Sequence, residues 1–235
     1  MKPTVLAILA LTLLVQDPPG AQPAPKEGGW VKRHEAFVEE AKKGGFDVLF
    51  MGDSITDAWR NGAQRKIWEA RFAPLKAANF GISGDRTQHA LWRLQNGEFE
   101  GLTLPKVVVL MIGTNNVGQT KPPPEPAASA IAGIQAIVKE IHKRSSTTRI
   151  LLLGVFPRAE KPDHALRAAV KEINEAAAKL DDGGKSVKYL DIGEKFLQPD
   201  GTISKEIMPD FLHLSEKGYQ IWADAIKEPL AALLK

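Results

Sequence analysis

Five short apolar runs alternate along the chain with stretches in which apolar residues recur at helical spacing. Continuous runs of this length are typical of strands buried on both faces of a sheet. The runs cover residues 47–52, 76–81, 106–113, 149–156 and 188–193. The stripe that runs from Ile131 through Ile134 and Val138 to Ile141 predicts a helix. A second stripe runs from Leu166 to Leu180, and a third helix is expected over residues 215–234.

This alternation of strands and helices predicts the fold class. It implies βαβ units and an α/β protein with a five-stranded parallel sheet, covered by helices on both faces as a three-layer α/β/α domain. The length of 235 residues fits one such domain, expected over residues 30–235. Ligands of these sheets bind beyond the carboxyl ends of the strands, so functional polar residues should follow the apolar runs.

The first 29 residues differ from the rest of the chain. Lys2 precedes an eleven-residue apolar core, residues 5–15, which is too short to span a bilayer, and a stretch rich in Pro, Ala and Gly follows. We predict a signal peptide over 1–21 and a flexible mature N-terminus over 22–29, with an uncleaved anchor as the alternative. The protein is then secreted or periplasmic, without a stable membrane span after removal of the leader.

Composition narrows the possible functions. The chain is 43% hydrophobic and 25% charged, as in a soluble globular protein. Its net charge is only +3, with acidic and basic residues interleaved, which argues against nucleic-acid binding. The absence of cysteine excludes a lipoprotein anchor and a disulfide framework. Asp53, Asp57 and Asp85 do not have EF-hand spacing and no HExxH motif occurs, so no metal is expected.

Small and polar residues do gather where the expected strands end. The stretches are GDSITD at 52–57, NFGISGDRT at 79–87, GTNN at 113–116 and, before the last helix, MPDFLHLSEKGY at 208–219. Acyl transfer requires a nucleophile, a base that takes its proton and a group that orients the base. We assign these roles to Ser54, His213 and Asp210, the last two being three residues apart.

The same stretches offer hydrogen-bond donors for an oxyanion. Gly84 supplies a backbone N–H without a side chain in the way, Asn115 a side-chain amide, and Ser54 its own N–H at the start of a helix. Three further residues, Asp53, His89 and Asn116, are expected near this site.

Each residue also has a purely structural interpretation. Ser54 followed by Asp57 fits a capping box, Gly84 fits a turn, Asn115 can tie down its loop, and Asp210 with His213 can be a surface pair. The order of all four stretches at element boundaries favours the catalytic interpretation. No GxSxG motif occurs, which excludes the nucleophile elbow of α/β-hydrolases.

Together these motifs are similar to those of the SGNH, or GDSL, hydrolase family. GDSIT resembles its nucleophile block, NFGISGD its glycine block, GTNN its asparagine block and DFLH its Asp-x-x-His block. Residues 79–101, 105–116, 151–167 and 213–219 most resemble platelet-activating-factor acetylhydrolase catalytic-subunit-like esterases. The resemblance implies a flavodoxin-like sheet of order 2-1-3-4-5, Ser54, His213 and Asp210 as catalytic residues, an oxyanion hole of Ser54, Gly84 and Asn115, and no metal or cofactor.

The resulting hypothesis is an exported serine esterase that removes a short acyl group from a carbohydrate, with acetyl as the expected acyl group. Two features differ from the intracellular enzymes that it resembles: the leader and the proline-rich stretch at 117–126. A phospholipid or platelet-activating-factor-like ester is the alternative substrate. A remote alternative for the function itself is a non-catalytic carbohydrate-binding module. A nucleotide binder has no supporting GxGxxG or P-loop sequence. The resemblance also implies a homodimer as a possible assembly, because the enzymes that it resembles pair as dimers.

Overall fold

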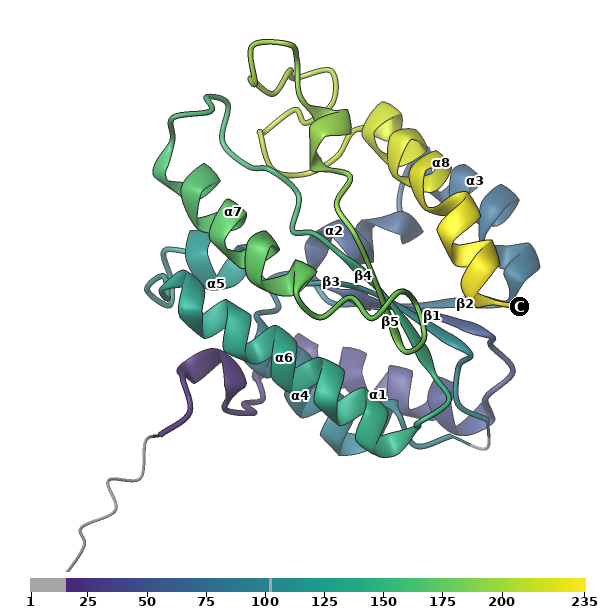
Figure 1. Ribbon diagram of the computed structural model, residues 1–235. Coiled ribbons are helices and arrows are strands. Elements are labelled where there is room, and N and C mark those ends of the chain that lie inside the picture. The colour runs from purple at the N-terminus through teal and green to yellow at the C-terminus, as the bar shows by residue number, and fades with distance from the viewer. Residues whose placement is uncertain (1–15, 102) are drawn as a thin grey trace, which may run out of the picture.

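A computed structural model describes residues 16–101 and 103–235 as one α/β/α domain built on a parallel sheet (Figure 1). The strands are β1 (Val48–Gly52), β2 (Ala77–Gly81), β3 (Val107–Met111), β4 (Arg149–Leu153) and β5 (Val187–Leu190). Their order is β2-β1-β3-β4-β5 and all neighbours pair in parallel, which confirms the predicted fold class and strand order.

Both faces of the sheet are buried because its strands carry apolar residues in both directions. In β1, Leu49 and Met51 belong to one hydrophobic cluster, while Val48 and Phe50 belong to the other. Successive side chains of a strand point to opposite faces, so a continuous apolar run supplies both cores. Strands of this kind need helices on each side of the sheet.

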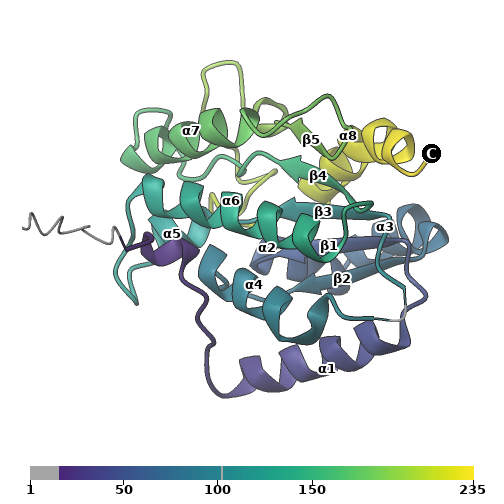
Figure 2. The same ribbon diagram turned by 60° about the horizontal axis from the view of Figure 1, so that its bottom comes forward.

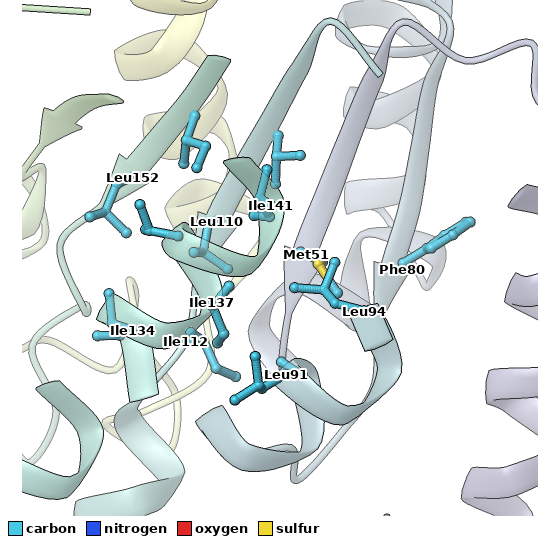
Figure 3. Packing of buried hydrophobic residues seen from close by; sticks show 14 of the residues in the cluster. Met51, Phe80, Leu91, Leu94, Leu110, Ile112, Ile134, Ile137, Ile141 and Leu152 are labelled. Carbon is cyan, nitrogen blue, oxygen red and sulfur yellow. The ribbon is translucent and has the colours of Figure 1, made fainter. Parts of the chain in front are cut away.

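Helices cover the two faces in separate groups (Figure 2). The first cluster packs the sheet against α1 (Gly29–Lys43), α4 (Thr87–Arg93), α6 (Ala127–Arg144) and α7 (Ala165–Ala178). The second packs it against α2 (Ser54–Asp57), α3 (Gln64–Arg71) and α8 (Glu216–Leu233). A short helix, α5 (Thr114–Gly118), follows β3, and the remaining helical turns are η1 (Pro19–Ala21), η2 (Ala58–Arg60), η3 (Ala73–Leu75), η4 (Leu94–Glu98) and η5 (Gly193–Phe196). Figure 3 shows Leu91 of α4, Ile137 of α6 and Leu110 of β3, which all belong to the first cluster.

The predicted runs are longer than the strands where they end near the site. Ile112 and residues 154–156 continue the apolar pattern, but β3 ends at Met111 and β4 at Leu153. These extra residues remain buried because the loops at this edge lie between helices. Strand β1 ends at the first residue of GDSITD, β2 ends within NFGISGDRT at Gly81, and only Ile112 separates the end of β3 from GTNN.

The beginning of the described chain packs on the domain. The predicted leader lies mostly outside the described residues, but its end forms η1, whose Gly20 is buried. Residues 22–29, predicted as a flexible mature N-terminus, make two hydrogen bonds to the domain: Ala24 N donates to Gln88 O and Lys26 Nζ donates to Gly84 O. Among the residues described, no helix combines the length and hydropathy needed to cross a membrane.

Candidate active site

Ser54 lies at the first position of α2, directly beyond β1. Its neighbour Asp53 caps the helix, since Asp53 Oδ1 accepts a hydrogen bond from Ile55 N at 3.0 Å. The cap position is therefore taken, and the Ser54 hydroxyl is directed elsewhere. Ser54 Oγ lies 2.9 Å from His213 Nε2, across the loop that precedes α8. This is the distance expected between a nucleophile and its base.

A tight turn brings Asp210 and His213 together. Asp210 Oδ2 lies 2.7 Å from His213 Nδ1, while Asp210 Oδ1 accepts the backbone N–H groups of His213 and Leu212 at 2.7 and 3.1 Å. Desolvation alone would raise the pKa of Asp210, but the hydrogen bonds from the side chain and backbone of His213 outweigh it and lower that pKa. An aspartate that stays ionised and accepts Nδ1–H leaves Nε2 free to accept the Ser54 proton.

The turn holds Phe211 in a strained conformation. Its φ of 59° lies in the left-handed region, which costs a residue with a side chain about 1–2 kcal/mol. Phe211 N donates to Met208 O at 3.0 Å, and Phe211 O accepts from Ala159 N at 2.9 Å. These bonds fix the turn, so that Asp210 and His213 arrive on the same side of the loop.

Of the two further donors, Gly84 lies on the loop after β2 and Asn115 in the short helix α5, and hydrogen bonds join the loop to this helix. Asn115 Nδ2 donates to Asp85 O at 2.9 Å, and Gly84 O accepts a bond from Gln119 Nε2 at 3.1 Å. Gly84 has a φ of 76°, which an L-residue with a side chain adopts only with strain. The Asn115 amide carries two protons, and the bond to Asp85 uses one of them.

The three residues expected near the site have mainly structural contacts. Asp53 is fully buried, and this burial raises its pKa to about 7. His89 Nδ1 accepts from Arg86 N at 2.9 Å, and burial, together with the nearby Lys26, lowers the pKa of His89 to about 4. Asn116 Oδ1 accepts from the backbone N–H of Thr87 at 3.1 Å. All three therefore support the loops that carry Ser54, Gly84 and Asn115.

A buried ionic network behind the Gly84 loop is absent from the sequence-based prediction. Arg93 Nε lies 2.9 Å from Asp85 Oδ2, and Arg93 Nη1 lies 2.6 Å from Glu98 Oε2. Glu98 Oε1 meets His34 Nδ1 at 2.9 Å, and Trp30 Nε1 donates to Asp85 Oδ1 at 2.7 Å. The sequence contains one sign of this network: Arg93 is a charged residue in an otherwise apolar helical pattern. A charge at such a position is buried and needs a partner of opposite charge.

Two further arginines hold the edge of the site. Arg86 donates to the carbonyl groups of Pro122 and Pro123 and pairs with Glu125 at 2.8 Å, so the proline-rich stretch is bonded to the Gly84 loop. Arg158, after β4, donates Nη1 to Thr114 O at 2.9 Å, next to Asn115. Within residues 16–101 and 103–235, no group of three or more His, Cys, Asp or Glu side chains has the arrangement of a metal site.

Comparison with known proteins decides the family. The model of the GDSL-like lipase/acylhydrolase family matches residues 50–221, which include Ser54, Gly84, Asn115, Asp210 and His213. The chain belongs to this family. GDSL-like acylhydrolases are carboxylic ester hydrolases, and this chain is therefore an enzyme of that class.

Individual relatives extend the match over nearly the whole chain. Platelet-activating factor acetylhydrolase IB subunit alpha1 from Homo sapiens is 38% identical over 224 residues, covering 93% of this chain and 92% of its own. Two solved structures share the GDSL fold at lower identity. A GDSL-like lipase from Bacteroides thetaiotaomicron has a TM-score of 0.63, 20% identity and coverage of 86% and 96% of the two chains. An acetyl-xylooligosaccharide esterase from Geobacillus Stearmophilus has a TM-score of 0.61, 20% identity and coverage of 83% and 96%.

Proposed function

We propose that the protein is an exported serine esterase that removes short acyl groups, acetyl above all, by a Ser-His-Asp mechanism. The observation that carries the proposal is the continuous chain of contacts from Ser54 Oγ to His213 Nε2, at 2.9 Å, and from His213 Nδ1 to Asp210 Oδ2, at 2.7 Å. If Ser54 were only a helix cap, and Asp210 and His213 only a surface pair, no contact between Ser54 and His213 would be expected.

The proposed reaction has two halves. Ser54 Oγ attacks the ester carbonyl while His213 takes the hydroxyl proton, and His213 then gives that proton to the departing alcohol. Water, deprotonated by His213, hydrolyses the acyl-enzyme and restores Ser54. The backbone N–H groups of Ser54 and Gly84 and the Asn115 amide receive the negative charge that develops on the carbonyl oxygen.

An acetylated carbohydrate is the proposed substrate. Val31 is the one large hydrophobic side chain exposed among the described residues, and it is 36% exposed. A surface of this kind suits a soluble polymer or oligosaccharide better than a lipid aggregate, which selects for exposed apolar patches. The predicted leader would place the enzyme where polysaccharides occur. The Geobacillus esterase shows that this fold can serve an acetylated oligosaccharide.

A platelet-activating-factor-like phospholipid is the second candidate substrate. It is favoured by the 38% identity to a platelet-activating factor acetylhydrolase subunit, which extends over 93% of the chain. A short-chain lipid of this type can be handled as a dissolved monomer, so it does not require an apolar surface patch.

Acetate release distinguishes the two substrates. We expect the purified enzyme to release acetate faster from acetylated xylooligosaccharides than from a 2-acetyl phospholipid below its critical micelle concentration, at equal ester concentration. A Ser54→Ala variant should release acetate from neither. A higher kcat/KM for the phospholipid would favour the second candidate, and full activity of Ser54→Ala would overturn the proposed mechanism.

A further inference from the structure

The segment that precedes α1 is bonded to the loop that carries Gly84. Figures 1 and 2 show this segment lying beside α6 and α5 before it turns towards α1. Gly20 N donates to Ser129 Oγ of α6 at 2.7 Å, and Thr87 Oγ1 of α4 donates to Gly20 O at 2.9 Å. Further along, Ala24 N donates to Gln88 O at 3.2 Å. The segment thus follows the first turn of α4, immediately after the Gly84 loop.

The contact at Gly20 is too close for any other residue. A Cβ atom at position 20 would overlap the backbone carbonyl of Ser129 and come within 2.8 Å of Thr87 Oγ1. A Cβ atom at Gly133 of α6 would overlap both Thr87 Oγ1 and Gly20 O. Because neither glycine has a side chain, Gly20 lies directly against α6, and we call this contact the seat of the segment. The segment therefore belongs to the folded domain, although its composition is that of a linker.

Two bonds connect this segment to the proposed oxyanion donors. Thr87 Oγ1, which holds Gly20, also accepts from Asn116 Nδ2 at 3.0 Å, and Asn116 adjoins Asn115. Lys26 Nζ donates to Gly84 O at 3.2 Å and lies 3.7 Å from the buried Asp85 Oδ1. The segment touches one donor residue directly and reaches the neighbour of the other.

We infer that residues 18–26 form a strap that sets the position of the Gly84 loop, and that Lys26 is a positioning residue for the Gly84 N–H donor. This inference rests on the proposed function, because it assigns to the strap an effect on the oxyanion hole. The Gly84 N–H lies in the peptide group before Cα and the Gly84 carbonyl in the one after it. Bonds to the carbonyl therefore act on the N–H by fixing the Gly84 backbone, which glycine otherwise leaves unusually free. Lys26 and Gln119 both donate to the Gly84 carbonyl and together hold it.

The strap also bears on how a leader could be removed. Cleavage after Ala21, the boundary suggested by the sequence, would delete η1 and with it both Gly20 bonds. An enzyme cut there would keep Lys26 on a segment that has lost its seat. A processed enzyme with an intact strap therefore begins at or before Pro18.

The test is a comparison of Lys26→Met with Lys32→Met in the full chain. Both changes remove one positive charge from the same hollow between α1 and the Gly84 loop, but Lys32 is exposed on α1, whereas Lys26 is bonded to the Gly84 carbonyl. With p-nitrophenyl acetate, we expect Lys26→Met to lower kcat about tenfold with KM nearly unchanged, because an oxyanion donor acts in the transition state. The loss should stay below the about 10²–10³-fold cost of deleting a direct donor, since Gln119 still holds the carbonyl. The rate of labelling of Ser54 by a fluorophosphonate should fall in parallel.

Two controls separate positioning from folding and from general charge effects. Lys26→Arg keeps the donor and the charge and should restore most of the activity, while the melting temperatures of all three variants should stay close to that of the wild type. Equal losses in Lys26→Met and Lys32→Met would overturn the inference in favour of a long-range charge effect. Wild-type kcat in Lys26→Met would overturn it outright. The failure of the proposed function is a different result: it would appear as activity that survives Ser54→Ala.

Discussion

Replacing Asp210 by asparagine alters a single hydrogen bond of the proposed catalytic chain. The asparagine side chain is isosteric, and its carbonyl oxygen can still accept the backbone N–H groups that Asp210 Oδ1 accepts from Leu212 and His213. Its NH₂ group would then face His213 Nδ1, where Oδ2 now lies at 2.7 Å. An N–H donor at that place favours the tautomer in which Nε2 carries the proton, so His213 can no longer accept the proton of Ser54.

The structure sets the size of this effect. Two unit charges 4 Å apart attract by about 1 kcal/mol in water and about 4 kcal/mol at a protein surface. The side chains of Asp210 and His213 are 55% and 44% exposed, so the lower half of that range applies to the stabilisation of the imidazolium. This accounts for roughly 5–70-fold in rate, and the unfavourable tautomer adds to it. We expect Asp210→Asn to lower kcat/KM about 10³-fold, less than the about 10⁴-fold found for a buried triad aspartate.

The assay is hydrolysis of p-nitrophenyl acetate by the wild type, Asp210→Asn and the control Asp200→Asn. Asp200 is also an exposed aspartate that accepts bonds within its own turn, from Thr202 N at 2.9 Å and Thr202 Oγ1 at 2.7 Å. The control should keep wild-type kcat/KM, and both variants should melt close to the wild type. A fall of less than about threefold in Asp210→Asn, or an equal fall in Asp200→Asn, would refute the role given to Asp210.

Three other substitutions test the surroundings of the site. Gly84→Ala should lower both kcat and the melting temperature. A side chain at a φ of 76° costs about 1–2 kcal/mol, and its Cβ would lie 3.3 Å from Gln119 Nε2 and from Lys26 Nζ, which bond the loop. Unchanged kcat would argue against a donor at this position. Asp53→Asn should flatten the pH dependence of stability between about pH 4 and 7, measured by urea unfolding. In the wild type the pKa of Asp53 is raised to about 7 by burial, so the folded state holds a proton that the unfolded state loses and stability falls as pH rises through this window, by up to about 4 kcal/mol. A wild-type pH profile in Asp53→Asn would show that Asp53 does not titrate in this way. Ile137→Ala, in the core of Figure 3, should lower the free energy of unfolding by about 2–5 kcal/mol and leave kcat unchanged; a loss below about 1 kcal/mol would contradict tight packing there.

The sheet is predictable because its burial is encoded locally. The strands β1 and β3 are continuous apolar runs, β4 is one after Arg149, and the helices α6, α7 and α8 each show one clean apolar stripe. The edge strands β2 and β5 are weaker, because Asn79 and Lys188 interrupt them.

Helix α1 is not evident from the pattern, although Trp30, Phe37 and Ala41 are buried along one side. His34 interrupts that stripe, and its burial makes sense only with Glu98 as a partner 64 residues away. A pairing over such a distance cannot be read from periodicity.

The candidate site is predictable for a different reason. Ser54, Gly84 and Asn115 belong to stretches at the ends of β1, β2 and β3, which a parallel sheet brings to one edge. Asp210 and His213 precede α8 instead, and their place beside Ser54 rests on the contacts of His213 with Ser54 and Asp210. The supports of the site are not predictable. Lys26 lies in a stretch of proline, alanine and glycine that resembles a linker, and only the seat of Gly20 on α6 shows that it is part of the fold.

The most direct test of the proposed mechanism is to identify the residue that acts as the nucleophile and forms the covalent bond. A fluorophosphonate probe, followed by proteolysis and mass spectrometry, identifies the nucleophile without reference to any natural substrate. The account predicts one adduct, on Ser54, and no labelling of Ser54→Ala under the same conditions. An adduct on another residue, or a Ser54→Ala variant that is labelled and active like the wild type, would contradict it.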